Sequence, residues 1–95
     1  MLDAKHSELR EQTNRIGIDF LFAELEMALT FLQVGESSDS QESRHRNFEK
    51  ALEGYRTVLH FLPRVVPSTD QQAQLQLQMD KVKHRLEAGG YSCGT

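Results

Sequence analysis

Apolar residues follow a helical spacing in three segments of this chain, and two polar stretches separate those segments. Within each segment they recur every three or four positions, which gathers them on one face of an α-helix. Gly17 is the only glycine before residue 35 and Pro63 is the first proline, so the first third carries few helix breakers. The pattern predicts an all-α fold, an antiparallel three-helix bundle with helices at about residues 3–34, 44–65 and 69–88.

The two polar stretches and a glycine pair predict where these helices end. Gly35 opens the serine-rich, acidic stretch GESSDSQES, whose composition is typical of a solvated loop. The pair Gly89–Gly90 predicts the end of the third helix. We therefore expect one domain over residues 1–88 and a flexible tail over 89–95, in which Cys93 takes no part in chemistry. Three residues of the segment PSTDQQ are able to cap the third helix: Ser68, Thr69 and Asp70.

The first helix is more apolar than a single neighbouring helix can cover. Between residues 16 and 34 its apolar side chains spread around most of the helix and leave only a narrow polar strip. Before that segment, Leu2, Leu9 and Ile16 recur at seven-residue spacing, with His6 and Thr13 between them, which forms a weak heptad seam. Two interpretations follow: the first helix is central and touches both others, or part of it meets another chain. The polar strip consists of Asp19, Glu26, Thr30 and Gln33.

The other two predicted helices carry narrower apolar faces. In the second helix one face is apolar from Phe48 to Leu62, and charged residues occupy the opposite face. The third helix has a thin stripe surrounded by Gln and Lys residues, which predicts an outer helix that packs through one seam. That stripe consists of Leu75, Met79, Val82 and Leu86.

Composition and charge narrow the function classes. The 95 residues include 38% hydrophobic and 26% charged residues, which fits one small globular domain. A net charge of -3 argues against nucleic-acid binding, because a basic excess is what offsets phosphate repulsion. We expect no membrane contact and a cytoplasmic location, since there is no apolar run of spanning length and no signal-peptide pattern at the start.

The candidate catalytic and metal-binding residues favour a structural interpretation. The four histidines form no pair at helical spacing, and Glu42 with His45 gives only one of the two motifs that a carboxylate-bridged di-iron bundle needs. Asp19, Glu24 and Glu26 on the apolar first helix are the candidate acid–base carboxylates. Asp19 and Glu26 lie on the polar strip that faces water, and Glu24 is placed to pair with a basic residue of a neighbouring helix, so a structural role is favoured. We therefore expect no enzymatic activity, no cofactor and no metal.

One segment, NFEKALEGYRTVLHFLP, resembles the second helix of a tetratricopeptide repeat. A small residue, Ala51, is followed by Tyr55, Leu59 and the closing Pro63, although no second copy of the motif occurs. With a third helix ending in KVKHRLEAGG, residues 16–88 also resemble the microtubule-interacting-and-trafficking domain. That resemblance implies a three-helix relative of the tetratricopeptide fold, which binds short amphipathic peptides beside its third helix.

These observations predict a non-enzymatic protein–protein interaction module, either a homodimer formed through the first helix or a peptide-binding adaptor. The alternative is a small-molecule or metal-binding regulatory bundle, with a pocket among Phe20, Phe22, Tyr55 and Phe61. The expected partner is a protein: a second copy or a helical peptide. The candidate interaction surface consists of Phe20, Met27, Phe31, Leu75, Met79, Val82 and Leu86.

Overall fold

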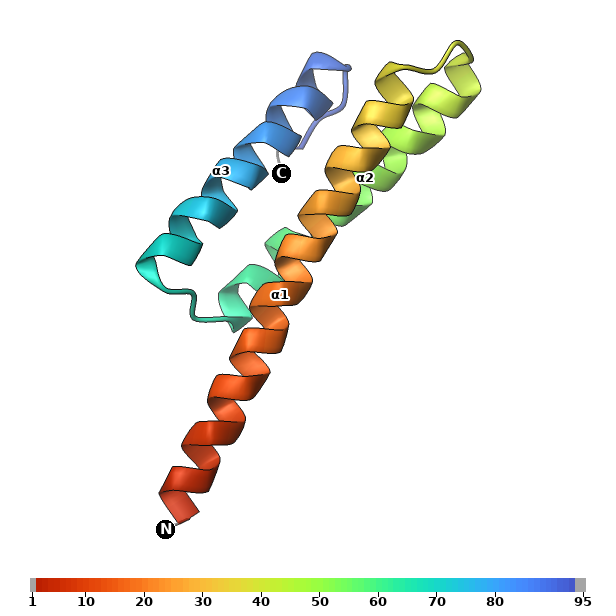
Figure 1. Cartoon of the computed structure of the whole chain (residues 1–95). Coiled ribbons are helices and arrows are strands. Elements are labelled where there is room, and N and C mark those ends of the chain that lie inside the picture. Colours follow the sequence, from red (N-terminus) through yellow and green to blue (C-terminus); the bar gives the residue numbers. More distant parts are fainter. Residues whose placement is uncertain (1, 94–95) are drawn as a thin grey trace.

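The computed structural model describes the backbone of residues 2–93 and the side chains of residues 8–93. Its elements are α1 (Leu2–Glu36), α2 (Gln41–Phe61), the short 3-10 helix η1 (Leu62–Arg64) and α3 (Thr69–Ala88). Figure 1 shows α2 and α3 packed along the second half of α1, while the first half of α1 projects beyond them. The predicted all-α, three-helix architecture is confirmed.

The boundary between α1 and α2 differs from the prediction, because the loop is confined to residues 37–40 and both ends of the serine-rich stretch are helical. Ser40 caps α2, and its hydroxyl accepts a hydrogen bond from the Ser43 amide at 3.2 Å, so α2 begins at Gln41 rather than near residue 44. α1 continues through Gly35 to Glu36. A Cβ atom at Gly35 would lie 2.8 Å from the Phe48 ring, so glycine is required there by packing and does not end the helix.

The ends of α3 agree with the prediction. Ser68 provides a capping box: its hydroxyl accepts from the Gln71 amide at 3.2 Å, and the Gln71 side chain accepts from the Ser68 amide at 2.9 Å. Gly89 forms the C-cap, and Gly90 follows with a φ of 92°, a conformation that favours glycine. At the end of α2 the chain tightens into η1 at Pro63 instead of continuing as α-helix to residue 65.

The core lies between the three helices and includes the whole apolar stripe of α3. α3 packs on a surface that is formed by the second half of α1 and the apolar face of α2. It buries its continuous apolar stripe there. The stripe residues are 0–5% exposed, so the expectation that they form an accessible binding surface is wrong. These buried stripe residues are Leu75, Met79, Val82 and Leu86.

Small residues allow α1 and α2 to pack closely. Ala51 of α2 and Ala28 of α1 are almost completely buried. Gly54 faces α1 as well, and a Cβ atom built there would lie 3.6 Å from Ala28 Cβ, an ordinary van der Waals distance. Close approach of the two backbones explains why this helix pair supplies most of the core.

The segment after α3 packs back onto the bundle, in contrast to the flexible tail that we expected. Tyr91 stacks on Phe48 with ring centroids 5.2 Å apart, and Cys93 is only 7% exposed. The Tyr91 amide donates a hydrogen bond to Leu86 O at 2.9 Å, which turns the chain back toward α2. Residues 94 and 95 lie outside the described part of the chain.

Within residues 2–93, none of the helices combines the length and the apolar character needed to cross a bilayer.

Candidate interaction surface

The apolar side chains of α1 divide between two opposite faces. One set is 0–2% exposed and forms part of the core: Ile18, Leu21, Leu25 and Leu32. The other set is exposed to solvent and forms a row that we call the outer seam. Its members, with their exposed fractions, are Leu9 (59%), Ile16 (62%), Phe20 (41%), Met27 (52%) and Val34 (48%).

The two sets face in opposite directions because of their positions in the helical repeat. At about 100° per residue, the outer seam gathers within a narrow arc on the side of α1 that is opposite to the centre of the core set. The predicted polar strip is exposed as well and lies beside the seam. The excess apolar character of α1 is therefore explained only in part by its contacts with α2 and α3.

Part of the outer seam is held in place by the end of α2. The Phe20 ring meets the Phe61 ring edge to face, with centroids 5.9 Å apart and ring planes at 88°. The Arg64 guanidinium lies 5.3 Å from the centre of the Phe61 ring. Phe20 consequently has an ordered neighbour on one side and solvent on the other.

The connection between α2 and α3 is fastened to α1 close to the seam. Asn14 donates a hydrogen bond from its side chain to Val66 O at 2.9 Å and accepts one from the Val66 amide at 2.6 Å. Val65 approaches Gly17, where an added Cβ would lie 2.7 Å from a Val65 methyl group. Beside this contact runs a groove of about 580 Å³, lined by residues of α1 that include Leu9 and by Arg64 and Val66.

The structure places the predicted surface residues in different environments. Phe20 and Met27 lie on the outer seam. Phe31 lies at its margin, half-buried, with Lys50 Nζ 5.4 Å from the ring centre. Leu9, Ile16 and Val34 were not among the predicted surface residues, although the seven-residue spacing of Leu9 and Ile16 was visible in the sequence. The missing information was which apolar residues of α1 the other two helices cover.

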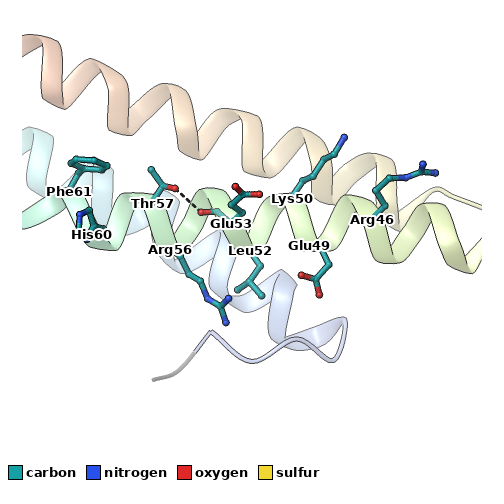
Figure 2. A pocket seen from close by; sticks show the side chains of 9 residues that line it. All are labelled: Arg46, Glu49, Lys50, Leu52, Glu53, Arg56, Thr57, His60 and Phe61. Carbon is teal, nitrogen blue, oxygen red and sulfur yellow. Dashed lines mark hydrogen bonds between the residues drawn. The ribbon is translucent and has the colours of Figure 1, made fainter.

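A larger hollow of about 600 Å³ lies on the outer side of α2. Figure 2 shows Arg46 and Lys50 directed toward α1, while Leu52 and Arg56 are directed toward α3 and the C-terminal segment. Positive and negative side chains alternate along this surface, which leaves no concentrated charge to select a ligand. We therefore regard it as the solvated face of α2 and place the candidate surface on α1.

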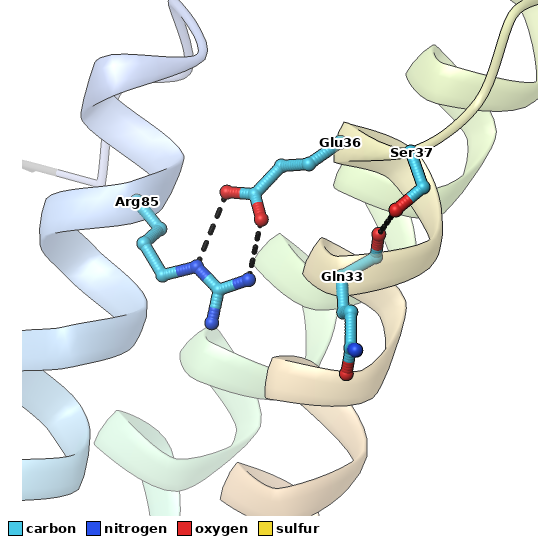
Figure 3. A network of polar contacts seen from close by, with 4 residues as sticks. All are labelled: Gln33, Glu36, Ser37 and Arg85. Carbon is cyan, nitrogen blue, oxygen red and sulfur yellow. Dashed lines mark hydrogen bonds and ion pairs between the residues drawn. The ribbon is translucent and has the colours of Figure 1, made fainter.

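One ion pair joins the end of α1 to α3. The Arg85 guanidinium donates two hydrogen bonds to the Glu36 carboxylate, with Nε 3.1 Å from Oε2, as Figure 3 shows. This hydrogen bond holds the pKa of the Glu36 carboxyl below its ordinary value, although partial burial acts in the opposite direction. The pair stabilises the packing of α3 on α1 and lies away from the outer seam.

Two ionisable groups of the core have raised pKa values. Burial raises the pKa of the Cys93 thiol, and the nearby Glu87 carboxylate adds to that effect. Burial also raises the pKa of the Tyr55 hydroxyl. Both groups therefore stay protonated near neutral pH, which makes Cys93 a poor nucleophile.

The candidate acid–base and metal-binding residues lie in separate environments in the part of the chain whose side chains are described. Asp19 is exposed, and Glu24 is half-buried above Gly54. Among residues 8–93, no three His, Cys, Asp or Glu side chains lie close enough together to hold a metal ion. Of the aromatic residues proposed for a small-molecule pocket, Phe20 and Phe61 are in contact, whereas Tyr55 is buried in the core.

Comparisons of this chain with protein-family models, with curated protein sequences and with solved structures return no match. The resemblance to the tetratricopeptide and microtubule-interacting-and-trafficking families therefore stays a prediction. Its residues have packing roles in the structure: Ala51 and Tyr55 are buried between helices, and Pro63 lies in η1 at the end of α2.

Proposed function

We propose that this protein is a helical interaction module whose working surface is the outer seam of α1. The seam would receive an amphipathic helix from another polypeptide chain, and the protein would act through this contact rather than through catalysis. One observation carries the proposal: five large apolar side chains lie exposed in one row on the face of α1 opposite to the core.

A row of this kind differs from the scattered apolar residues of an ordinary protein surface. Single exposed leucines are common and need no explanation, whereas a contiguous apolar row flanked by polar residues is typical of an interaction site. Its members recur at intervals of four or seven residues, which keeps them on one face of α1, where another helix can pack along them. The buried stripe of α3 supports no such role, so the adaptor version that used α3 is no longer proposed.

Site-specific photo-crosslinking tests this proposal in the cells that make the protein. A photoreactive benzoylphenylalanine replaces Met27, which is 52% exposed on the seam, and the matched control replaces Leu77, which is 50% exposed on α3. We expect a discrete protein adduct from position 27, absent from position 77. Ile16→Glu should abolish the adduct while the far-ultraviolet circular dichroism spectrum stays helical. Equal adducts at both positions, or none at position 27, would contradict the proposal.

A further inference from the structure

One series of exposed positions along α1 advances in alternating steps of four and three residues. The outer seam supplies the large side chains, and Thr13, Ala23 and Thr30 supply small exposed ones between them. This alternation is the heptad pattern through which two helices pack in a coiled coil. The complete series is Leu9, Thr13, Ile16, Phe20, Ala23, Met27, Thr30 and Val34.

The seam is long enough to select a partner helix of similar length. The outer seam runs from Leu9 to Val34 of α1, which at 1.5 Å per residue corresponds to roughly 40 Å of helix. Figure 1 shows that its first half extends beyond α2 and α3, so a second helix can reach that half without meeting them. A second copy of this chain presents a seam of the same length and the same pattern.

Charged residues on the two flanks of the seam distinguish the possible orientations of such a copy. One flank, on the side of α2, consists of Arg10, Gly17, Glu24 and Phe31. The other flank consists of Gln12, Asp19, Glu26 and Gln33. Among residues 8–93, neither Arg10 nor Glu24 forms an ion pair within the chain.

A parallel arrangement of two copies is disfavoured by these flanks. In a parallel coiled coil, a residue of one flank meets the residue five positions later on the other flank of the neighbouring helix. Asp19 would then lie against Glu24 of the second copy, and the symmetry would repeat this contact. Two acidic contacts would form, whereas Arg10 would lie against position 5 of the second copy and would not offset them.

An antiparallel arrangement brings opposite charges together. We consider the register that overlaps the two helices most fully. In it, each flank meets the same flank of the second copy, whose residues run in the opposite direction. Arg10 lies against Glu24 of the second copy, twice by symmetry, while only one Asp19–Asp19 contact is unfavourable. The same register stacks Leu9 on Met27 and Ile16 on Phe20 of the second copy, so large apolar side chains cover one another.

We propose that two copies of this chain associate through their outer seams as an antiparallel coiled coil, with Arg10 of each copy against Glu24 of the other. This inference rests on the proposed function and names the partner as the chain itself. Association buries the exposed apolar row, which a monomer leaves in contact with water.

Disulfide trapping tests the relative orientation of the two α1 helices directly. In a Cys93→Ala background, Leu9→Cys protein is mixed with a size-tagged Met27→Cys protein and oxidised. The antiparallel model predicts a disulfide between the two different variants and little between identical ones, because two copies of position 9 would lie far apart. A parallel dimer would give disulfides between identical variants and would overturn the proposal. Leu77→Cys, exposed on α3, is the matched control and should remain uncoupled.

Charge exchange tests the predicted pair without relying on cysteine chemistry. Arg10→Glu and Glu24→Arg should each weaken self-association by roughly tenfold, since two favourable contacts become unfavourable. The double variant should recover most of the affinity, as measured by sedimentation equilibrium. Failure of the double variant to recover, with all variants equally helical, would overturn the assigned contact.

The oligomeric state of the unmodified protein distinguishes the proposed self-association from the proposed function. A strict monomer at high concentration by light scattering, combined with an adduct of a different protein at position 27, overturns the self-association and keeps the proposed function. A monomer that gives no adduct overturns both. A dimer that Ile16→Glu dissociates, with the mixed disulfide formed, supports both.

Discussion

Tyr91 lies against Phe48 with the two rings nearly parallel, at an interplanar angle of 21°, and its hydroxyl shares a hydrogen bond of 2.6 Å with His45 Nδ1. Phe48 also packs against Gly35 and Gly89, so its ring contacts α1, the end of α3 and the C-terminal segment. These contacts fasten the segment after α3 to the start of α2. Residues 91–93 are therefore part of the domain.

Replacing Tyr91 with alanine tests the contribution of this contact. Tyr91→Ala removes the stacked ring and the hydrogen bond to His45, and we expect a loss of about 1–2 kcal/mol in the free energy of unfolding. Urea denaturation followed by circular dichroism measures it. Ser92→Ala is the control, because Ser92 is exposed and should change the unfolding free energy by less than about 0.5 kcal/mol. Equal effects of the two variants would show that the ring contributes nothing.

Cys93 should react slowly with thiol reagents in the folded protein. Burial and its raised pKa both reduce the accessible thiolate, so modification by a disulfide reagent at pH 8 should be roughly tenfold slower than in 6 M urea. The control is a Leu77→Cys, Cys93→Ala variant, whose exposed thiol should react at a similar rate in both solvents. A fast reaction of native Cys93 would contradict the packed position of residues 91–93.

Two helical glycines should respond oppositely to the same substitution. Gly35→Ala places a methyl group 2.8 Å from the Phe48 ring and should lower the free energy of unfolding by about 1–3 kcal/mol. Gly54→Ala meets its neighbours only at 3.5 Å or more and should raise it by about 0.5–1 kcal/mol, because alanine favours the helix. Thermal or urea unfolding of both variants measures the difference. Stabilisation by both would mean that α1 and α2 pack less closely at Gly35.

The ion pair between Glu36 and Arg85 should make stability depend on acid pH. Because the pKa of Glu36 is lower in the folded protein than its ordinary value of 4.5, the pair contributes above that pH, and the contribution is lost as pH falls through the folded value. Both side chains are about one-third exposed, so we expect no more than about 1 kcal/mol. Glu36→Gln should therefore lose less stability between pH 7 and 3 than the unmodified protein, measured by urea midpoints.

Glu26→Gln is the control for that experiment. Glu26 is exposed and forms no ion pair within residues 8–93, so its substitution should leave the acid dependence unchanged. Identical acid profiles for Glu36→Gln and the unmodified protein would show that the pair does not influence stability.

The apolar stripe of α3 should behave as core. Leu75→Ala should lower the free energy of unfolding by about 2–5 kcal/mol, because Leu75 is 1% exposed and truncation leaves a cavity. Leu77→Ala, at a position that is 50% exposed, should cost less than about 1 kcal/mol. Chemical denaturation measures both. If Leu75→Ala were equally mild, α3 would not be held on the bundle through this stripe.

The helices were predictable because their signals are local. Ser68 and Gln71 stand at the spacing of a capping box, and Gly89 with Gly90 ends the helix, so the bounds of α3 agree with the prediction. The helical role of Gly35 was not predictable in this way. It depends on the Phe48 ring, which packing of the folded chain brings so close to Gly35 that an added Cβ atom would lie 2.8 Å from it.

The candidate surface could be predicted only in part, for the same reason. Periodicity showed that α1 has more apolar residues than one neighbour covers, and Phe20 and Met27 are exposed as expected. Periodicity does not show which face α2 and α3 occupy, so Ile16 and Val34 were missed. The sequence of α3 shows an apolar row but does not show what covers it, so its burial could not be predicted.

We expect the hydrogen bonds between Asn14 and Val66 to divide α1 into two units that open separately. The turns before Asn14 belong to the half of α1 that projects beyond α2 and α3, so they should open at a smaller local free-energy cost than the later turns, which pack against the core. The side chain of Asn14 marks the boundary between these units. We therefore expect the projecting half of α1 to open and re-form while the folded bundle stays intact.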